Sequence, residues 1–149
     1  MVETLVLGRA AGAVGGTVRR AVATRLRLAL RALGRARSSA TLVFTDDDEI
    51  RALNRRYRRH DRATDVLSFH LQELAGEDDP AGAGINLGDI VISVETARRR
   101  AAGKRLQSEL ERLAIHGLCH LFGHDHKKKA EARVMFALER RLRRLPLPT

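Results

Sequence analysis

Two kinds of hydrophobic pattern alternate along the chain. Short runs of apolar and β-branched residues, bounded by glycine and polar residues, predict strands. These strands cover residues 2–7, 40–44, 66–71 and 86–93. Apolar residues spaced by three and four predict helices over residues 18–33, 45–57, 93–102, 108–122 and 127–145. The pattern therefore predicts one α+β domain over residues 1–149, a small mixed sheet of about four strands packed against helices.

Polar residues mark where several of these elements begin and end. Thr45-Asp-Asp-Asp-Glu49 opens the second helix, where carboxylates are better explained as caps of free amides than as metal ligands. Ser108-Glu-Leu-Glu111 has the form of a capping box and predicts the start of the central helix. Residues 71–84 are rich in glycine and acidic side chains, which predicts a solvated loop.

The central helix carries the candidate chemistry, in the stretch His116-Gly-Leu-Cys-His-Leu-Phe-Gly-His-Asp-His126. His116 and His120 are four residues apart, so they lie only about 40° apart around a helix axis. On a continuous helix His126 would lie about 240° round from His120. Gly123 removes that conflict, because a glycine after a helix end adopts a positive φ cheaply and lets the chain turn back. The three histidines are therefore predicted to converge on one metal ion.

Three neutral imidazoles suit a Zn²⁺-type ion and leave a fourth position open, as in catalytic sites. The spacing is that of the zincin-like pattern H-E-x-x-H-x-x-G-x-x-H, with Gly117 in place of the glutamate that serves peptidases as general base. This sequence therefore has the metal-binding histidines of that pattern but lacks the base that cleaves peptides.

Residues beside the motif allow more than one interpretation. Cys119, the single cysteine, is better explained as a small buried residue than as a ligand. His124 could be a fourth ligand, a proton-transfer group or a solvated loop residue. Asp125 could orient a ligand by accepting an imidazole N–H, cap the next helix, or do both. Lys127 and Lys128 could attract phosphate or could simply be solvated.

Composition narrows the class of partner. The 28 Lys and Arg residues exceed the 18 Asp and Glu residues and give a formal net charge of +10, which suits a polyanion although the arginines are spread over nearly every helix. With no Trp and one Tyr, contacts to a nucleic acid backbone are expected to outweigh stacking. The absence of a long apolar run or a signal-like start, with one cysteine, predicts a cytoplasmic protein without a membrane partner.

The histidine stretch closely resembles the H-G-x-L-H-L-x-G-Y-D-H signature of the YbeY family of rRNA maturation factors, which are metal-dependent single-strand endoribonucleases. Residues 53–58 resemble the family's Asn-Arg-x-Tyr-Arg run, residues 61–69 its D-x-P-T-D-V-L-S-F, and residues 87–93 its L-G-D-I-x-I-S. Ala63 and His70 replace prolines of that pattern. The first forty residues match only in general shape.

The resemblance implies an endoribonuclease that binds single-stranded RNA, processes the 3′ end of small-subunit rRNA, and acts in ribosome quality control with ribosomal partners. It implies a functional Arg58 near the metal, where a guanidinium suits phosphate contact. His116, His120 and His126 would hold one Zn²⁺ or a similar divalent ion per chain. Three possibilities remain for the attack on the phosphate, because Gly117 removes the usual carboxylate base. Hydroxide bound to the ion could act alone, His124 could serve as the base, or the RNA's own 2′-OH could be the nucleophile. Asp89 could contact a metal ligand or hold the edge of its strand.

The histidine motif is also compatible with two other functions. A ribosome-associated binding protein could carry a structural zinc, closed by Cys119 or His124 as a fourth ligand. A peptidase would need the base that Gly117 replaces.

Overall fold

The computed structural model describes residues 1–71, 85–124 and 127–147. Its elements follow one another in the order β1 (Val2–Val6), α1 (Ala10–Ala13), α2 (Gly16–Ala32), β2 (Ser39–Thr45), α3 (Asp47–Arg58), β3 (Val66–His70), β4 (Asn86–Ser93), α5 (Val94–Ala101), α6 (Leu106–Leu121) and α7 (Lys129–Arg143). The predicted strands are all present, each with bounds within one residue. The predicted loop at residues 71–84 lies, except for Leu71, outside the described residues.

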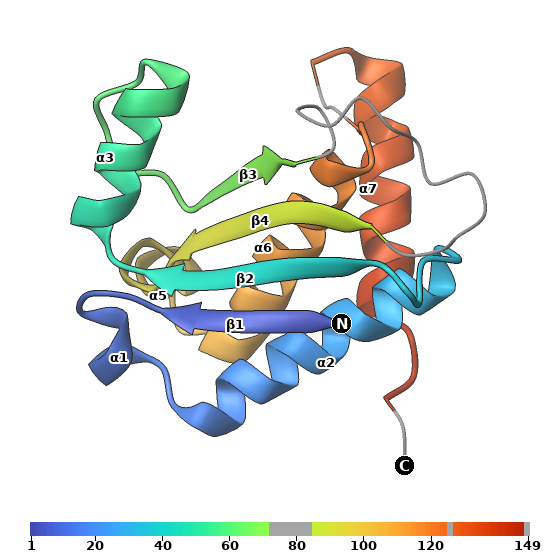
Figure 1. The fold of residues 1–149 in the computed structure, drawn as a ribbon, viewed down its shortest axis with the longest axis horizontal. Coiled ribbons are helices and arrows are strands. Elements are labelled where there is room, and N and C mark those ends of the chain that lie inside the picture. Colours follow the sequence, from blue (N-terminus) through green and yellow to red (C-terminus); the bar gives the residue numbers. More distant parts are fainter. Residues whose placement is uncertain (72–84, 125–126, 148–149) are drawn as a thin grey trace.

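The strands form one mixed sheet in the order β1-β2-β4-β3 (Figure 1). β1 and β4 each run parallel to β2, whereas β3 runs antiparallel to β4 and occupies the edge. Ser68 of β3 lies opposite Ile90 of β4. The α+β class and the mixed four-stranded sheet expected from the pattern are therefore confirmed.

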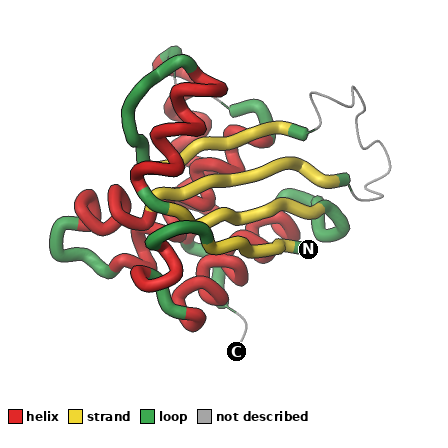
Figure 2. The backbone as a smooth tube through the Cα atoms, turned by 60° about the vertical axis from the view of Figure 1, so that its left-hand side comes forward, coloured by secondary structure: helices red, strands yellow, loops and turns green. Residues whose placement is uncertain are grey.

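Helices cover the two faces of this sheet unequally (Figures 1 and 2). The main core lies between the sheet and α2, α6 and α7, and its fully buried side chains include Leu26, Phe44, Ile90 and Ile115. A smaller cluster of Val43, Ile50 and Val91 lies under α3 on the opposite face. The apolar stripe of α6 thus holds that helix against β3 and β4.

The predicted start of α3 is confirmed, whereas the predicted start of α6 is not. Asp46 caps α3 as expected, because its Oδ1 accepts the backbone N–H of Glu49 at 2.9 Å. The predicted capping box of the central helix is wrong. α6 begins at Leu106 without a side-chain cap, since Leu106 packs on the main core and starts the helix ahead of Ser108.

One element was missed. Residues 10–13 form the short helix α1, in a glycine-interrupted stretch for which the sequence predicted no helix. Its first residue, Ala10, is buried in the main core, and the preceding Arg9 donates its backbone N–H to Asp46 at 2.9 Å. Tertiary packing explains this turn of helix better than local propensity does. Within the described ranges, no helix has both the length and the apolar character needed to span a membrane.

Candidate active site

α6 brings His116 and His120 together on one face, as their spacing predicts. Their rings meet edge to face with centroids 4.7 Å apart, and the two Nε2 atoms are 3.2 Å apart. Two nitrogens bound to Zn²⁺ at about 2.0–2.1 Å in a tetrahedral arrangement would be about 3.3–3.4 Å apart. The observed separation is close to that value, so these two side chains fit a shared metal ion.

α6 ends in the turn that the sequence predicts. Gly123 has φ 84°, its N–H donates to the carbonyl of His120 at 2.9 Å, and the N–H of His124 donates to the carbonyl of Cys119 at 3.1 Å. This pair of bonds is the Schellman motif, which reverses the chain after a helix. His126 and Asp125 lie outside the described residues, and within the described part no three His, Cys, Asp or Glu side chains form a metal-binding group. The third ligand therefore stays a prediction.

A buried carboxylate lies behind the first histidine. Oε1 of Glu139, on α7, is 2.5 Å from Nδ1 of His116, and Glu139 is only 6% exposed. With the proton on Nδ1, the imidazole donates to the carboxylate and keeps the lone pair of Nε2 for a metal. The sequence offered Asp125 as one candidate for this role, with helix capping as the alternative, and Asp125 lies outside the described residues. Sequence spacing did not reveal Glu139, which is 23 residues from His116.

Gly117 lies where α6 touches the sheet most closely. A Cβ atom there would come within 2.6 Å of Ile90 Cγ2 and 3.0 Å of Ser68 Oγ, and Ser68 Oγ donates to the Gly117 carbonyl at 3.0 Å. The glutamate that peptidases carry at this position could not be accommodated here, because this contact leaves no room for its side chain. The geometry argues against a peptidase.

Arg58 reaches the same site from the end of α3. Its Nη2 donates to the carbonyl of Ser68 at 2.7 Å, and its guanidinium lies 5.0 Å from the centre of the Phe69 ring. Two of the five guanidinium N–H groups are needed for the hydrogen bonds to the carbonyls of Ser68 and Tyr57. The remaining donors can still contact a phosphate.

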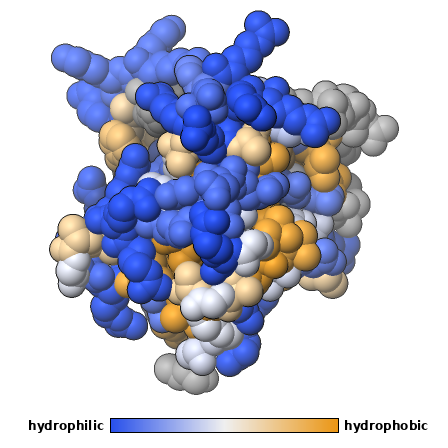
Figure 3. Space-filling view, turned by 90° about the vertical axis from the view of Figure 1, so that its left-hand side faces the viewer, coloured by the Kyte–Doolittle hydropathy of each residue, from blue (hydrophilic) through white to orange (hydrophobic). Residues whose placement is uncertain are grey.

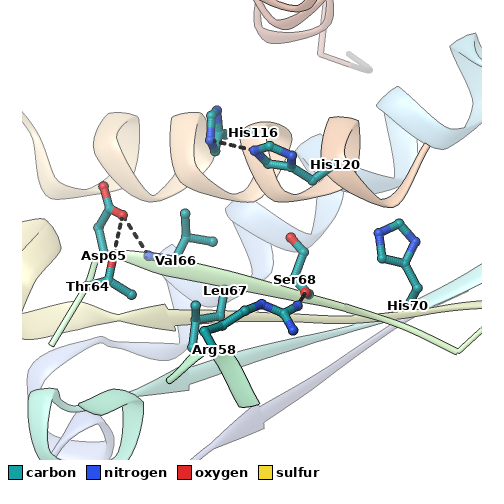
Figure 4. Close-up of a pocket in the computed structure, with 9 residues that line it drawn as sticks. All are labelled: Arg58, Thr64, Asp65, Val66, Leu67, Ser68, His70, His116 and His120. Carbon is teal, nitrogen blue, oxygen red and sulfur yellow. Dashed lines mark hydrogen bonds between the residues drawn. The ribbon is translucent and has the colours of Figure 1, made fainter. Parts of the chain in front are cut away.

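These side chains line a cleft of about 360 Å³ between α6 and the edge strand β3 (Figure 4). Arg58 and His70 approach from the strand side, and His116 and His120 from the helix side. Thr64 and Asp65 close one end, where Asp65 is fixed by an ion pair of 2.5 Å with Arg100. The arrangement places the imidazoles of His116 and His120 and the guanidinium of Arg58 in the lining of one cleft.

The remaining candidates lie elsewhere. His124 lines a separate hollow with Ala130 and Val134 on α7, and Lys127 and Lys128 are exposed before that helix. Cys119 is fully buried in the main core, and burial raises the pKa of its thiol to about 12. That environment matches the expected small apolar residue.

Asp89 occupies the face of β4 opposite the histidines. It is paired with Phe69 of β3, and its carboxylate has no hydrogen-bond partner among the described residues. Burial raises the pKa of this carboxyl. Among the described residues, Asp89 makes no contact with His116 or His120 and no side-chain bond that holds the strand edge, and the predicted ligand His126 lies outside them.

Sequence reasoning missed three residues of the site. Ser68 and Glu139 act through contacts between elements far apart in the chain, which spacing cannot show. His70 could have been noticed, because it replaces a proline of the resembled family at the end of β3.

Comparisons with known proteins agree with this geometry. Residues 16–145 match the family model described as endoribonuclease YbeY. The chain is 44% identical over 132 residues to the endoribonuclease YbeY of Anaeromyxobacter dehalogenans, covering 87% of this chain and 65% of that protein. It is 47% identical over 111 residues to that of Aquifex aeolicus, covering 73% and 70%.

The fold is similar to the solution structure of TM1509 from Thermotoga maritima, with a TM-score of 0.65, 23% identity, and coverage of 96% of this chain and 87% of that one. The chain spans about two thirds of the length of its Anaeromyxobacter relatives, 65% and 66%. The match to the family model covers most of the chain and includes the histidine helix, Arg58 and the edge strand. The chain therefore belongs to the endoribonuclease YbeY family.

Proposed function

We propose that this protein is a metal-dependent endoribonuclease that cleaves single-stranded RNA during rRNA maturation. The observation that carries the proposal is the cleft that His116 and His120, whose Nε2 atoms are 3.2 Å apart, line together with Arg58. Relatives that are 44% and 47% identical carry the name endoribonuclease. Processing of the small-subunit rRNA 3′ end, ribosome quality control and ribosomal partners belong to the same proposal.

His116, His120 and His126 would hold one Zn²⁺ or a similar divalent ion. When bound, such an ion polarises a phosphodiester and makes water a nucleophile near neutral pH. Glu139 would accept a hydrogen bond from Nδ1–H of His116 and so leave Nε2 of that ring free to bind the ion.

Arg58 would bind the scissile phosphate. Its bond to the Ser68 carbonyl and its position over the Phe69 ring hold the guanidinium in place before RNA arrives. A preorganised cation stabilises the negative charge that develops on the phosphate during cleavage. Arg58 therefore serves both binding and catalysis.

The products identify the nucleophile, and variants of the nearby histidines identify the group that accepts its proton. Attack by the RNA 2′-OH leaves a 2′,3′-cyclic phosphate, whereas attack by water leaves a phosphomonoester directly. His70 lines the cleft and His124 does not. We therefore expect a His70→Ala variant to lose more activity than a His124→Ala variant.

The proposal is tested with purified wild type, Arg58→Ala, His120→Ala and the control Arg31→Ala, an exposed arginine at the end of α2. Bound metal per chain and cleavage of a single-stranded rRNA fragment are measured for each. We expect Arg58→Ala to keep metal and lose about 10²-fold or more in cleavage rate, and His120→Ala to lose both. Equal cleavage by all four proteins would indicate a contaminating nuclease and reject the proposal.

A further inference from the structure

We propose that the arginine-rich end of α3 is a second binding surface for the RNA, beside the cleft and separate from the scissile phosphate. This surface consists of Arg55, Arg56, Tyr57, Arg59 and Arg62, and we call it the α3 platform. The inference rests on the proposed function and extends it, because it names where the strand lies outside the site of cleavage.

The charge of the α3 platform is not neutralised by the protein. Residues 51–62 contain six arginines and one acidic residue, Asp61, whose carboxylate is paired with Arg51 at 2.9 Å. Arg55, Arg56, Arg59 and Arg62 are exposed, and no carboxylate in the described part of the chain forms an ion pair with them. Arg9 and Arg99, which are also exposed, have carboxylate partners, whereas the exposed Arg20, Arg27 and Arg31 of α2 form no ion pair with a carboxylate of the described residues. Unpaired cations on one surface favour a polyanion, since binding then releases its counterions.

The platform is continuous with the cleft. Arg55 lies one helical turn before Arg58, on the same face of α3, and Arg62 is two residues before Thr64, which lines the cleft. Figure 3 shows hydrophilic side chains projecting from the end of the molecule where α3 finishes. A strand whose phosphate contacts Arg58 would therefore continue over Arg55 and Arg62, the platform arginines nearest the cleft.

The loop that carries Arg59 and Arg62 is fixed without a ligand. The side chain of Asn54, which is 4% exposed, donates to the carbonyl of Arg62 at 2.9 Å. The backbone N–H of His60 donates to the carbonyl of Asn54 at 3.2 Å. A preordered surface loses little conformational entropy when RNA binds.

Arg59 occupies a position that favours glycine. It ends α3 with φ 60°, whereas Gly34 and Gly123 take the positive φ after α2 and α6. Ala102, at the end of α5, is the other described non-glycine residue with such a φ, and it carries no charge. An arginine at this strained position keeps a cation on the platform at a conformational cost.

Tyr57 favours a single strand as the ligand. Tyr57 is 51% exposed, its ring meets Phe69 edge to face with centroids 5.4 Å apart, and the Arg56 guanidinium lies 5.2 Å from the ring centre. An exposed aromatic ring among arginines can stack on an unpaired base, which a duplex does not present.

The test measures binding separately from cleavage. Fluorescence anisotropy follows a labelled 2′-O-methyl oligouridine of about twelve nucleotides on the metal-loaded protein, and the probe is checked to be intact afterwards. The α3 variant is Arg55→Ala/Arg56→Ala/Arg59→Ala. The matched control is Arg20→Ala/Arg27→Ala/Arg31→Ala, which removes the same three charges from exposed positions of α2.

We expect the α3 variant to bind at least tenfold more weakly than wild type and to lower the steepness of log K against log salt by about 2, or roughly 0.7 for each lost phosphate contact. The α2 control should stay within about twofold of wild type, because α2 packs on β1, at the sheet edge opposite to β3, which lines the cleft (Figure 1). Equal weakening of both variants would mean that only net charge matters and would overturn the inference, as would unchanged binding by the α3 variant.

The substitution Arg59→Gly separates a role in RNA binding from a role in stability, because the two roles predict opposite changes. Arg59→Gly should raise Tm by roughly 1–3 °C, since glycine adopts this φ without strain, and should weaken RNA binding. Weaker binding with a higher Tm supports the platform, and unchanged binding opposes it. Cleavage by the wild type is assayed in parallel. If the wild type binds RNA through the α3 platform but does not cleave it, the proposed function is rejected and the inference about the platform stands.

Discussion

Glu139 is the residue on which the orientation of His116 depends. Its carboxylate is buried between α6 and α7 and lies 2.5 Å from Nδ1 of His116. A carboxylate at this position fixes the proton on Nδ1 and strengthens Nε2 as a ligand. The predicted metal site therefore extends from α6 to α7, although none of its expected ligands lies within α7.

Replacing Glu139 with Gln should weaken metal binding by about tenfold or more, because the neutral amide is a poorer acceptor for the Nδ1–H group. Competition with a chromophoric chelator measures the dissociation constant. Glu131→Gln, an exposed change in the first turn of the same helix, is the control and should bind metal as wild type does. Equal affinities for the two variants would show that Glu139 does not support the ligand.

At the scale of elements, the site depends on how closely α6 approaches β3 and β4. Gly117 makes that approach possible, since a Cβ at this position would lie 2.6 Å from Ile90 Cγ2. The Ser68 hydroxyl then bridges the edge strand to the helix through the Gly117 carbonyl. Arg58 in turn is bonded to the Ser68 carbonyl, so the helix, the strand and the arginine are positioned together.

Gly117→Ala should destabilise the protein by about 1–3 kcal/mol, because overpacking exceeds the gain in helix propensity. Urea unfolding monitored by circular dichroism measures the change. Gly12→Ala is the matched control, since nothing lies within 4 Å of a Cβ at that helical position, and it should be neutral or stabilising. A Gly117→Ala protein as stable as wild type would contradict the close packing.

The sequence predicted some elements of the fold and of the site better than others. The strands and main helices were predictable, because their apolar spacing agrees with the side chains that the core buries. The start of α6 was misplaced since Leu106 packs on the core, which a local capping pattern does not reveal. His116, His120 and Arg58 were recognised from motifs, whereas Glu139 depends on the docking of α7 against α6, a contact that only the tertiary structure brings about.

For the whole molecule, the positive charge is distributed unevenly. Where β1 and β2 end, Arg9 is enclosed by the carboxylates of Asp46, Asp48 and Glu95. This network joins the turn after β1 to the N-terminal ends of α3 and α5. The α3 platform lies at the other end of α3, and its arginines lack such partners.

The acidic network should make stability depend on pH. The backbone N–H groups of Arg9 and Glu49 hold the pKa of Asp46 below its ordinary value of 3.8. Because the folded pKa is depressed, this stabilisation is present above about pH 4 and is lost as pH falls through the folded pKa. Asp46→Asn keeps a helix-capping side chain without the charge.

The Tm of Asp46→Asn should therefore be below that of wild type at pH 7, and the difference should narrow below about pH 4. Thermal unfolding between pH 7 and pH 2.5 measures both curves. A difference that stays constant over this range would mean that the charge of Asp46 does not contribute.

The central claim, an open metal site made of three histidines, is tested most directly by X-ray absorption spectroscopy of the zinc-loaded protein. We predict three imidazole nitrogens at about 2.0–2.1 Å and one oxygen from a non-protein ligand, with no sulfur. His126→Ala should lose one of the imidazole contributions. A Zn–S distance of about 2.3 Å, or four imidazoles, would show a closed site completed by Cys119 or His124 and would contradict the account.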